Sequence, residues 1–143
     1  MSEPTRPRRL YLDTSAYLCI LLGQRGWQRL SDETSGATIV SSVLLILEAR
    51  RNLVRLAREG TLDSAQYTAC IDRVEEDVEL FALRELTLDL CTSTSVPAVL
   101  TPRSLDLAHL RTALWFHVAD PLQRFVTLDE TQQQAAKELG LPV

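Results

Sequence analysis

The sequence predicts one α/β domain, with a central, mainly parallel sheet flanked by helices. Short apolar runs typical of buried strands alternate with longer segments typical of helices. The chain has 143 residues, 45% of them hydrophobic and 24% charged, which suits a single domain with a hydrophobic core. No repeat or linker divides it. We therefore expect residues 1–143 to form one domain, with residues 1–8 as a flexible N-terminal segment.

The first strand is the apolar run Leu10–Leu12, which leads through Asp13 into a helix that ends near Gly23. An amphipathic helix is expected next, over Trp27–Glu33. The β-branched run Ala37–Val40 predicts the second strand.

The Ser41-Ser42 pair then offers a cap for a long helix, which Gly60 stops. A further helix is expected over Leu62–Glu76. The run Val78–Leu83 predicts the third strand.

A short helix is expected near Leu86–Thr94, and a strongly apolar helix over Leu105–His117. The run Gln123–Thr127 predicts the fourth strand. The last helix, over Asp129–Leu139, ends at Gly140.

Composition excludes several classes of protein. The net charge of −4 argues against a basic protein that coats nucleic acid. The longest apolar stretches, Ala16–Leu22 and Val43–Leu47, are much shorter than the roughly 20 residues that span a bilayer, and the N-terminus lacks the apolar core of a signal peptide. Three widely spaced cysteines indicate reduced thiols. We expect a cytoplasmic protein with no membrane partner.

Four acidic residues stand where predicted strands lead into helices. Asp13 ends the first strand, Asp129 follows the last one, and Glu48 and Asp106 lie early in two apolar helices. Ligands of open α/β sheets bind beyond the carboxyl ends of the strands, so we expect the four to converge there. Taken singly, Asp13, Asp106 and Asp129 are each explained as a helix cap or as a first-turn charge.

Together, the four carboxylates favour a metal site. An unpaired carboxylate in apolar surroundings costs on the order of several kcal/mol unless a cation balances it. Oxygen ligands without a histidine or thiolate cluster indicate Mg²⁺ or Mn²⁺ rather than Zn²⁺. Beside Glu48, the side chains of Arg51, Arg55 and Arg58 share its helix face. They are either phosphate-binding groups next to the metal or a solvated face in which Glu48 pairs with Arg51.

Four motifs follow one another along the chain: Tyr11-Leu12-Asp13-Thr14-Ser15, Ser41-Ser42 with Glu48-Ala49-Arg50-Arg51, Arg103-Ser104-Leu105-Asp106-Leu107-Ala108-His109-Leu110, and Phe125-Val126-Thr127-Leu128-Asp129. In order, approximate spacing and total length they resemble the PIN-domain ribonucleases, most closely the VapC-type toxins of bacterial toxin–antitoxin pairs. The ending Ala135–Val143 also matches that family. Leu107 and Arg111 depart from it, since alanine is commoner at both positions.

The resemblance implies a PIN-like domain and a metal-dependent endoribonuclease, a hydrolase of RNA phosphodiester bonds. Asp13, Glu48, Asp106 and Asp129 would be the catalytic residues that hold Mg²⁺ or Mn²⁺. Ser15 and Thr127 would orient carboxylates or water through their hydroxyls, and Arg51 and Arg55 would contact RNA.

As the toxin of a toxin–antitoxin pair, the protein would have three partners. These are the RNA substrate, a small cognate antitoxin that covers a groove and pushes an arginine toward the acidic site, and a second copy in a homodimer. His109 we interpret as a packed, hydrogen-bonded residue of its apolar helix.

Other functions fit the sequence less well or stay open. Hydrolases with an aspartate nucleophile want D-x-D, but the second position is Ser15, and the late lysine of a receiver domain has no counterpart because Lys137 lies inside the last helix. No phosphate-binding P-loop or nucleophile elbow is present. A PIN-like module that binds RNA or protein without catalysis, and an RNA-processing nuclease with no antitoxin, remain alternatives.

Overall fold

Four parallel strands form the centre of the computed structural model, which describes residues 3–143, and the predicted α/β class is confirmed. The sheet order is β3-β2-β1-β4. The strands are β1 (Arg9–Leu12), β2 (Thr38–Ser42), β3 (Ala82–Arg84) and β4 (Arg124–Val126). The helices of the described residues are α1 (Thr14–Leu22), α2 (Trp27–Thr34), α3 (Leu44–Arg58), α4 (Ser64–Leu80), α5 (Leu88–Thr92), α6 (Ser104–Ala119) and α7 (Glu130–Glu138).

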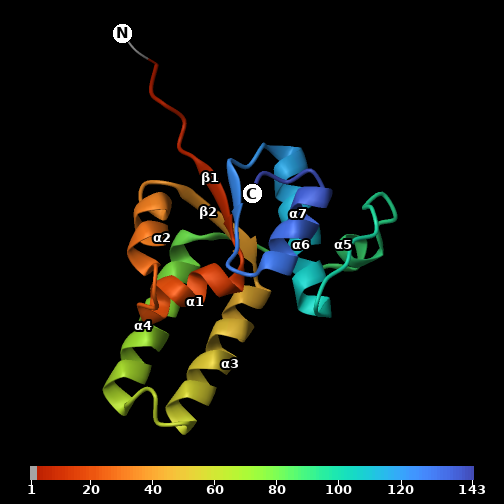
Figure 1. The fold of residues 1–143 in the computed structure, drawn as a ribbon. Helices are drawn as coiled ribbons and strands as arrows, with labels where there is room; N and C mark the ends of the chain where they lie inside the picture. The colour runs from red at the N-terminus through yellow and green to blue at the C-terminus, as the bar shows by residue number, and fades with distance from the viewer. Residues whose placement is uncertain (1–2) are drawn as a thin grey trace.

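Helices cover both faces of the sheet (Figure 1). Successive strand residues point to opposite faces, so Leu10 and Leu12 pack with α1, α3 and α4. Tyr11 and Phe125 face the other way, into a second buried cluster with α6 and α7. Because both faces are buried, the strands are continuous apolar runs rather than alternating ones.

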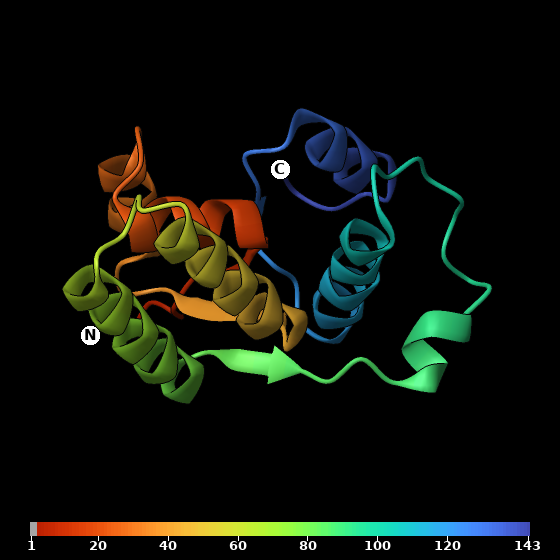
Figure 2. The same ribbon diagram turned by 90° about the horizontal axis from the view of Figure 1, so that it is seen from below.

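The long helix α3 ends near the predicted Gly60, but its N-cap is Val43, which makes no side-chain capping bond, instead of the predicted Ser41-Ser42 pair, which lies in β2. The Ser42 hydroxyl accepts a hydrogen bond from the Leu44 N–H at 3.2 Å. Gly60, just beyond the C-terminal end, has φ +79°, a left-handed conformation that costs glycine little. Antiparallel packing of α3 on α4 makes the helical hairpin that extends away from the sheet (Figures 1 and 2).

The third strand lies later in the chain than the sequence predicts. Helix α4 continues to Leu80, and β3 occupies Ala82–Arg84 instead of Val78–Leu83. Asp77 explains the longer helix, because its carboxylate accepts hydrogen bonds from Tyr17 Oη at 2.7 Å and from Arg73 Nε at 3.1 Å. These contacts tie the last turns of α4 to α1.

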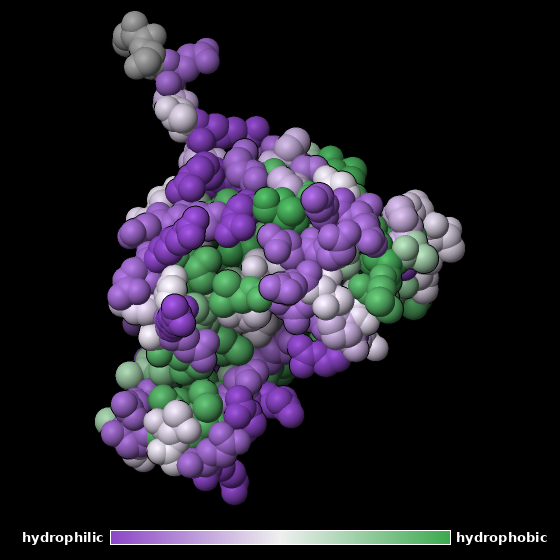
Figure 3. Space-filling view, viewed as in Figure 1, coloured by the Kyte–Doolittle hydropathy of each residue, from purple (hydrophilic) through white to green (hydrophobic). Residues whose placement is uncertain are grey.

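The N-terminal segment approaches β1 along the edge of α2. The Arg8 backbone carbonyl accepts from the Thr38 N–H at 2.7 Å, and the Arg8 guanidinium donates to the Glu33 carbonyl at 2.7 Å. Residues 1 and 2 of the segment expected to be flexible lie outside the described residues. Hydrophilic side chains dominate the face seen in Figure 3, and no helix between residues 3 and 143 combines the length and apolar character of a membrane span.

Candidate active site

The order in which the chain adds strands to the sheet reverses beside β1, and a ligand site is expected at this point. The chain runs from β1 through β2 to β3 and then returns, so that β4 pairs with the other side of β1. In parallel α/β sheets such a reversal opens a crevice at the carboxyl ends of the two strands. Asp13 directly follows β1, and the segment Thr127–Asp129 directly follows β4.

Asp13 is buried, and it is not used as a helix cap. It occupies the N-cap position of α1, but its side chain makes no capping hydrogen bond. Its Oδ2 accepts from the Thr127 hydroxyl at 2.7 Å and from the Ser15 hydroxyl at 3.4 Å. Burial raises the pKa of Asp13, and the nearby carboxylates of Asp106 and Glu48 raise it further, against a lowering by His109 and Thr127. The charges of Glu48 and Asp106 therefore act on Asp13.

Glu48 reaches the same place from the second turn of α3. Its Oε1 accepts from His109 Nε2 at 2.7 Å and from the Thr14 hydroxyl at 2.9 Å. Burial alone would raise the pKa of Glu48, but the hydrogen bonds from His109 and Thr14 outweigh it, and the pKa lies below its ordinary value. The ion pairs among residues 3–143 do not include the Glu48–Arg51 pair of the solvated-face interpretation.

His109 connects this carboxylate to the core. Its Nδ1 lies 2.7 Å from Tyr11 Oη, and its Nε2 lies 3.9 Å from Asp13 Oδ1. Burial and the Asp13 charge hold the pKa of Tyr11 well above its ordinary value, so its hydroxyl keeps its proton. An ionised Glu48 only accepts hydrogen bonds. Nε2–H can donate to Glu48 while Nδ1 pairs with the Tyr11 hydroxyl, so both ring nitrogens of His109 have partners.

His109 is thus the buried, hydrogen-bonded residue that its apolar helix predicts. It also has a contact that the sequence did not predict, because it holds Glu48 in place.

Asp106, in the first turn of α6, is buried and faces one arginine. The Arg103 Nε lies 3.3 Å from Asp106 Oδ2, and most of the Arg103 side chain is exposed. The Asp106 backbone carbonyl accepts from Gln132 Nε2 at 2.8 Å. Gln132 is fully buried, and its Oε1 has no hydrogen-bond partner among the described residues.

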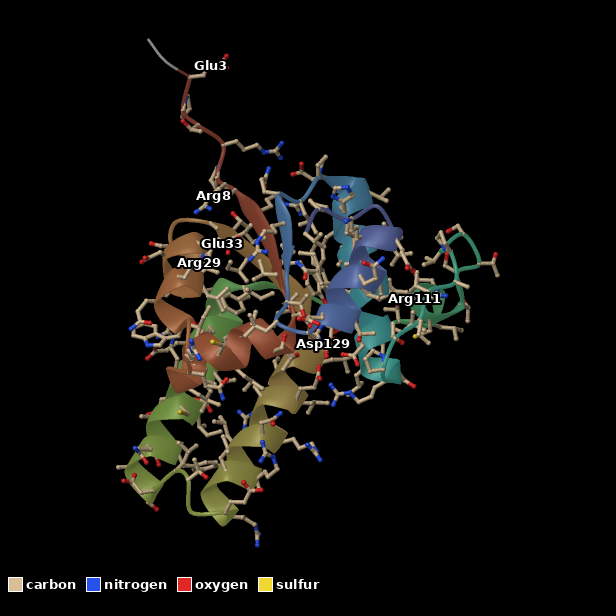
Figure 4. All side chains as sticks on the ribbon, in the orientation of Figure 1. Glu3, Arg8, Arg29, Glu33, Arg111 and Asp129 are labelled. Carbon is tan, nitrogen blue, oxygen red and sulfur yellow. The ribbon has the colours of Figure 1, made fainter. Side chains whose placement is uncertain are left out.

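Asp129 lies in the loop between β4 and α7 and is the N-cap of α7 (Figure 4). Its Oδ1 accepts from the Gln132 N–H at 2.9 Å, and its own N–H donates to the Thr127 hydroxyl at 3.2 Å. Thr127 therefore links the loop of Asp129 to the Asp13 carboxylate, while the Asp129 carboxylate itself serves the helix. No contact joins Asp129 directly to the other three acids in the described residues.

Of the other residues predicted for the site, the two hydroxyls lie at the Asp13 carboxylate, whereas the two arginines lie on the exposed surface of α3. Ser15 and Thr127 lie 3.2 Å apart at the Asp13 carboxylate, as their predicted orienting role requires. Arg51 and Arg55 are exposed on α3, and Arg55 pairs with Glu59 at 3.1 Å. Arg111, a departure from the family pattern, lies away from the acids and donates to the carbonyls of α5 and its following loop.

Sequence reasoning missed Thr14, Tyr11 and Gln132, each a buried polar side chain that contacts the predicted acids or their supports. Thr14 could have been predicted only from its position between Asp13 and Ser15, because its own residue type gives no indication of a site. Tyr11 could have been predicted more directly, because a buried tyrosine in an apolar strand needs a hydrogen-bond partner for its hydroxyl. Gln132 shows no pattern by itself in an otherwise polar helix.

The donor set suits a hard divalent cation, although the carboxylates now face other partners. Carboxylate oxygens are the ligands that Mg²⁺ and Mn²⁺ prefer. Within residues 3–143 no group of three or more His, Cys, Asp or Glu side chains is arranged to hold a metal ion. Each carboxylate instead accepts a hydrogen bond from a protein side chain: Asp13 from Thr127, Glu48 from His109 and Asp106 from Arg103. No arginine or lysine of residues 3–143 pairs with Asp13, whose Oδ1 lies 3.9 Å from His109 Nε2.

No protein-family model matches the chain, and no curated protein matches it either. The function therefore has to be argued from the site itself.

Proposed function

We propose that the chain is a metal-dependent endoribonuclease of the PIN-domain type, a cytoplasmic enzyme that hydrolyses RNA phosphodiester bonds with Mg²⁺ or Mn²⁺. The observation that carries the proposal is that the carboxylates of Asp13 and Glu48 lie 3.9 and 2.7 Å from the same His109 Nε2, beside the crevice between β1 and β4, with Asp106 near enough to raise the pKa of Asp13. A buried carboxylate whose pKa is raised by burial and by neighbouring carboxylates, as that of Asp13 is, destabilises a fold when it is ionised, so a scaffold gains nothing from it. A site that balances a bound cation needs such a carboxylate.

Asp13, Glu48 and Asp106 would hold the ion, and Asp129 would act from the adjoining loop through a water molecule. When bound, the ion supplies charge neutralisation at the phosphate and makes a water molecule more acidic. Thr127 and Ser15 orient the Asp13 carboxylate, and Tyr11 and His109 orient that of Glu48. Preoriented ligands of this kind bind metal more tightly than free ones.

Burial and hydrogen bonding shift the pKa values of the two acids in opposite directions. Burial raises the pKa of Asp13, whereas hydrogen bonds from His109 and Thr14 hold the pKa of Glu48 below its ordinary value despite its burial.

The role of toxin, with a small antitoxin and a homodimer, is part of the same proposal and rests on the resemblance. One contact supports restraint by an arginine. Arg103 shows that a guanidinium reaches Asp106 from the solvent side at 3.3 Å. An arginine supplied by a partner would gain the same charge-assisted hydrogen bond.

The test is cleavage of mixed cellular RNA by the purified protein with Mg²⁺, with Mn²⁺ and with chelator. Asp13→Asn removes the central charge but keeps an oxygen that accepts from Thr127. Asp72→Asn is the matched control, because Asp72 is an exposed residue of α4. We expect metal-dependent cutting by the wild type and the control and none by Asp13→Asn. A folded wild type that neither cuts RNA nor binds Mn²⁺ would overturn the proposal and favour a non-catalytic binding module.

A further inference from the structure

A pocket rich in arginine lies next to the acidic site, between α2, β4 and the loop after β4. It has a volume of about 890 Å³. Four arginines line it together with the carboxylates of Asp32 and Glu33: Arg8, Arg25, Arg29 and Arg124. Four positive against two negative charges leave a surplus of two positive charges in a protein whose net charge is −4.

Two of the four arginines are engaged in holding the pocket together. The Arg124 guanidinium forms a two-pronged ion pair with Glu33, in which NH2 lies 2.9 Å from Oε2. Arg8 donates to the backbone carbonyls of Glu33 and Ser35. Arg8, Arg29 and Glu33 lie close together beside α2 in Figure 4, and all the arginines except Arg25 lower the pKa of Glu33.

The other two, Arg25 and Arg29, are exposed, and their guanidinium groups make no hydrogen bond or ion pair within the described residues. Each guanidinium therefore has all its donors available, in the fork that matches phosphate oxygens. They flank Gly26, the N-cap of α2, so the positive end of the helix dipole adds to their charge. An anion in this pocket would meet two free guanidinium groups and a helix N-terminus.

The pocket and the acidic site share a wall. Thr127 and Leu128 line the pocket, and on their other side Thr127 donates to Asp13 while the Leu128 N–H donates to the Ser15 hydroxyl at 3.0 Å. A chain bound at Asp13 has only to cross the exposed Leu128 to reach Arg29.

We propose that the arginine pocket binds a backbone phosphate of the RNA strand whose neighbouring phosphodiester bond lies at the acidic site. The proposal builds on the ribonuclease function, which supplies the strand. It also answers how a protein of net negative charge attracts RNA, since the surplus of positive charge stands beside the carboxylates that would otherwise repel the strand.

The experiment measures binding of a fluorescently labelled single-stranded RNA of mixed sequence by anisotropy, with chelator present so that no cutting occurs, over a range of salt concentrations. The test variant is Arg25→Ala with Arg29→Ala. The control is Arg50→Ala with Lys137→Ala, which removes the same charge from exposed residues of α3 and α7. Equal melting temperatures verify that both double variants fold.

We expect the test variant to bind RNA on the order of tenfold more weakly, and its slope of log K against log salt to shrink by about 0.7, the value for one lost phosphate contact on a single strand. The control should keep the wild-type slope. Arg25→Lys with Arg29→Lys should keep the wild-type salt slope, because lysine keeps the charge, but should recover only part of the affinity, because lysine lacks the fork that matches phosphate oxygens.

Two results would overturn the proposal that the pocket binds phosphate. One is a test variant that binds RNA with the wild-type affinity and salt slope; the other is a control variant that loses as much RNA affinity as the test variant. The cleavage assay separates this from the enzyme proposal. If the wild type cuts RNA while the test variant binds normally, only the pocket fails. If the test variant loses binding while the wild type never cuts RNA with metal, the pocket stands as an RNA contact and the ribonuclease proposal fails.

Discussion

Replacing Tyr11 by phenylalanine removes one atom, the hydroxyl oxygen whose hydrogen bond to His109 connects the core to the candidate site. The hydroxyl lies 2.7 Å from His109 Nδ1, and both side chains are fully buried. A buried polar atom left without its partner costs about 1–3 kcal/mol. The phenyl ring can remain stacked on Phe125, at 5.2 Å between ring centroids, so little packing is lost. We expect the free energy of unfolding to fall by about 2 kcal/mol, or roughly 6–8 °C in melting temperature for a chain of this length.

Urea unfolding measures the change, with Tyr67→Phe as the control. The Tyr67 hydroxyl has no hydrogen bond within the described residues, so its loss should leave stability almost unchanged. With His109 released, Glu48 also loses its fixed donor, and Mn²⁺ affinity should fall with stability. A Tyr11→Phe protein within about 0.5 kcal/mol of the wild type would refute the chain from Tyr11 through His109 to Glu48.

Three further predictions use other contacts. Arg124 holds the pKa of Glu33 below its ordinary 4.5, so the pair stabilises the fold above that pH and loses its contribution as the pH falls further. Glu33→Gln should therefore flatten the acid side of the stability curve measured by urea unfolding, and an unchanged acid side would contradict the ion pair. Asp129→Ala should cost about 1 kcal/mol of unfolding free energy through the lost α7 cap, whereas Asp129→Asn should keep the cap; equal losses in thermal melts would exclude capping. Leu53→Ala should cost about 2–5 kcal/mol because the side chain is fully buried, and a loss below 1 kcal/mol, roughly that of a surface substitution, would contradict its place in the core.

The fold class could be predicted because each strand is a local signal. Leu10–Leu12 and Phe125–Val126 are apolar runs that soon lead into helices, and the structure has both as strands, β1 inside the sheet and β4 at its edge. The boundary between α4 and β3 could not be predicted this way. Whether Val78–Leu80 is helical depends on Asp77 meeting Tyr17, a residue 60 positions away.

The candidate site shows the same division. Its acids were picked out by their places after strands and inside apolar helices, and in the structure Asp13 and Glu48 both lie next to His109 Nε2. Their hydrogen-bond partners were not, since His109 and Tyr11 are 98 positions apart and neither has a local pattern that names the other. The role of Asp129 in capping α7 depends on the turn geometry after β4, which residue types alone do not determine.

The central claim is that the carboxylates at the β1–β4 crevice hold one divalent cation site, and Mn²⁺ binding followed by electron paramagnetic resonance tests it most directly. The proteins to compare are the wild type, Asp13→Asn and the exposed control Asp72→Asn. The account predicts that the wild type and the control bind Mn²⁺, while Asp13→Asn, folded to the same degree, binds it roughly tenfold more weakly or less well still. Equal Mn²⁺ affinity in Asp13→Asn and the wild type would contradict the account.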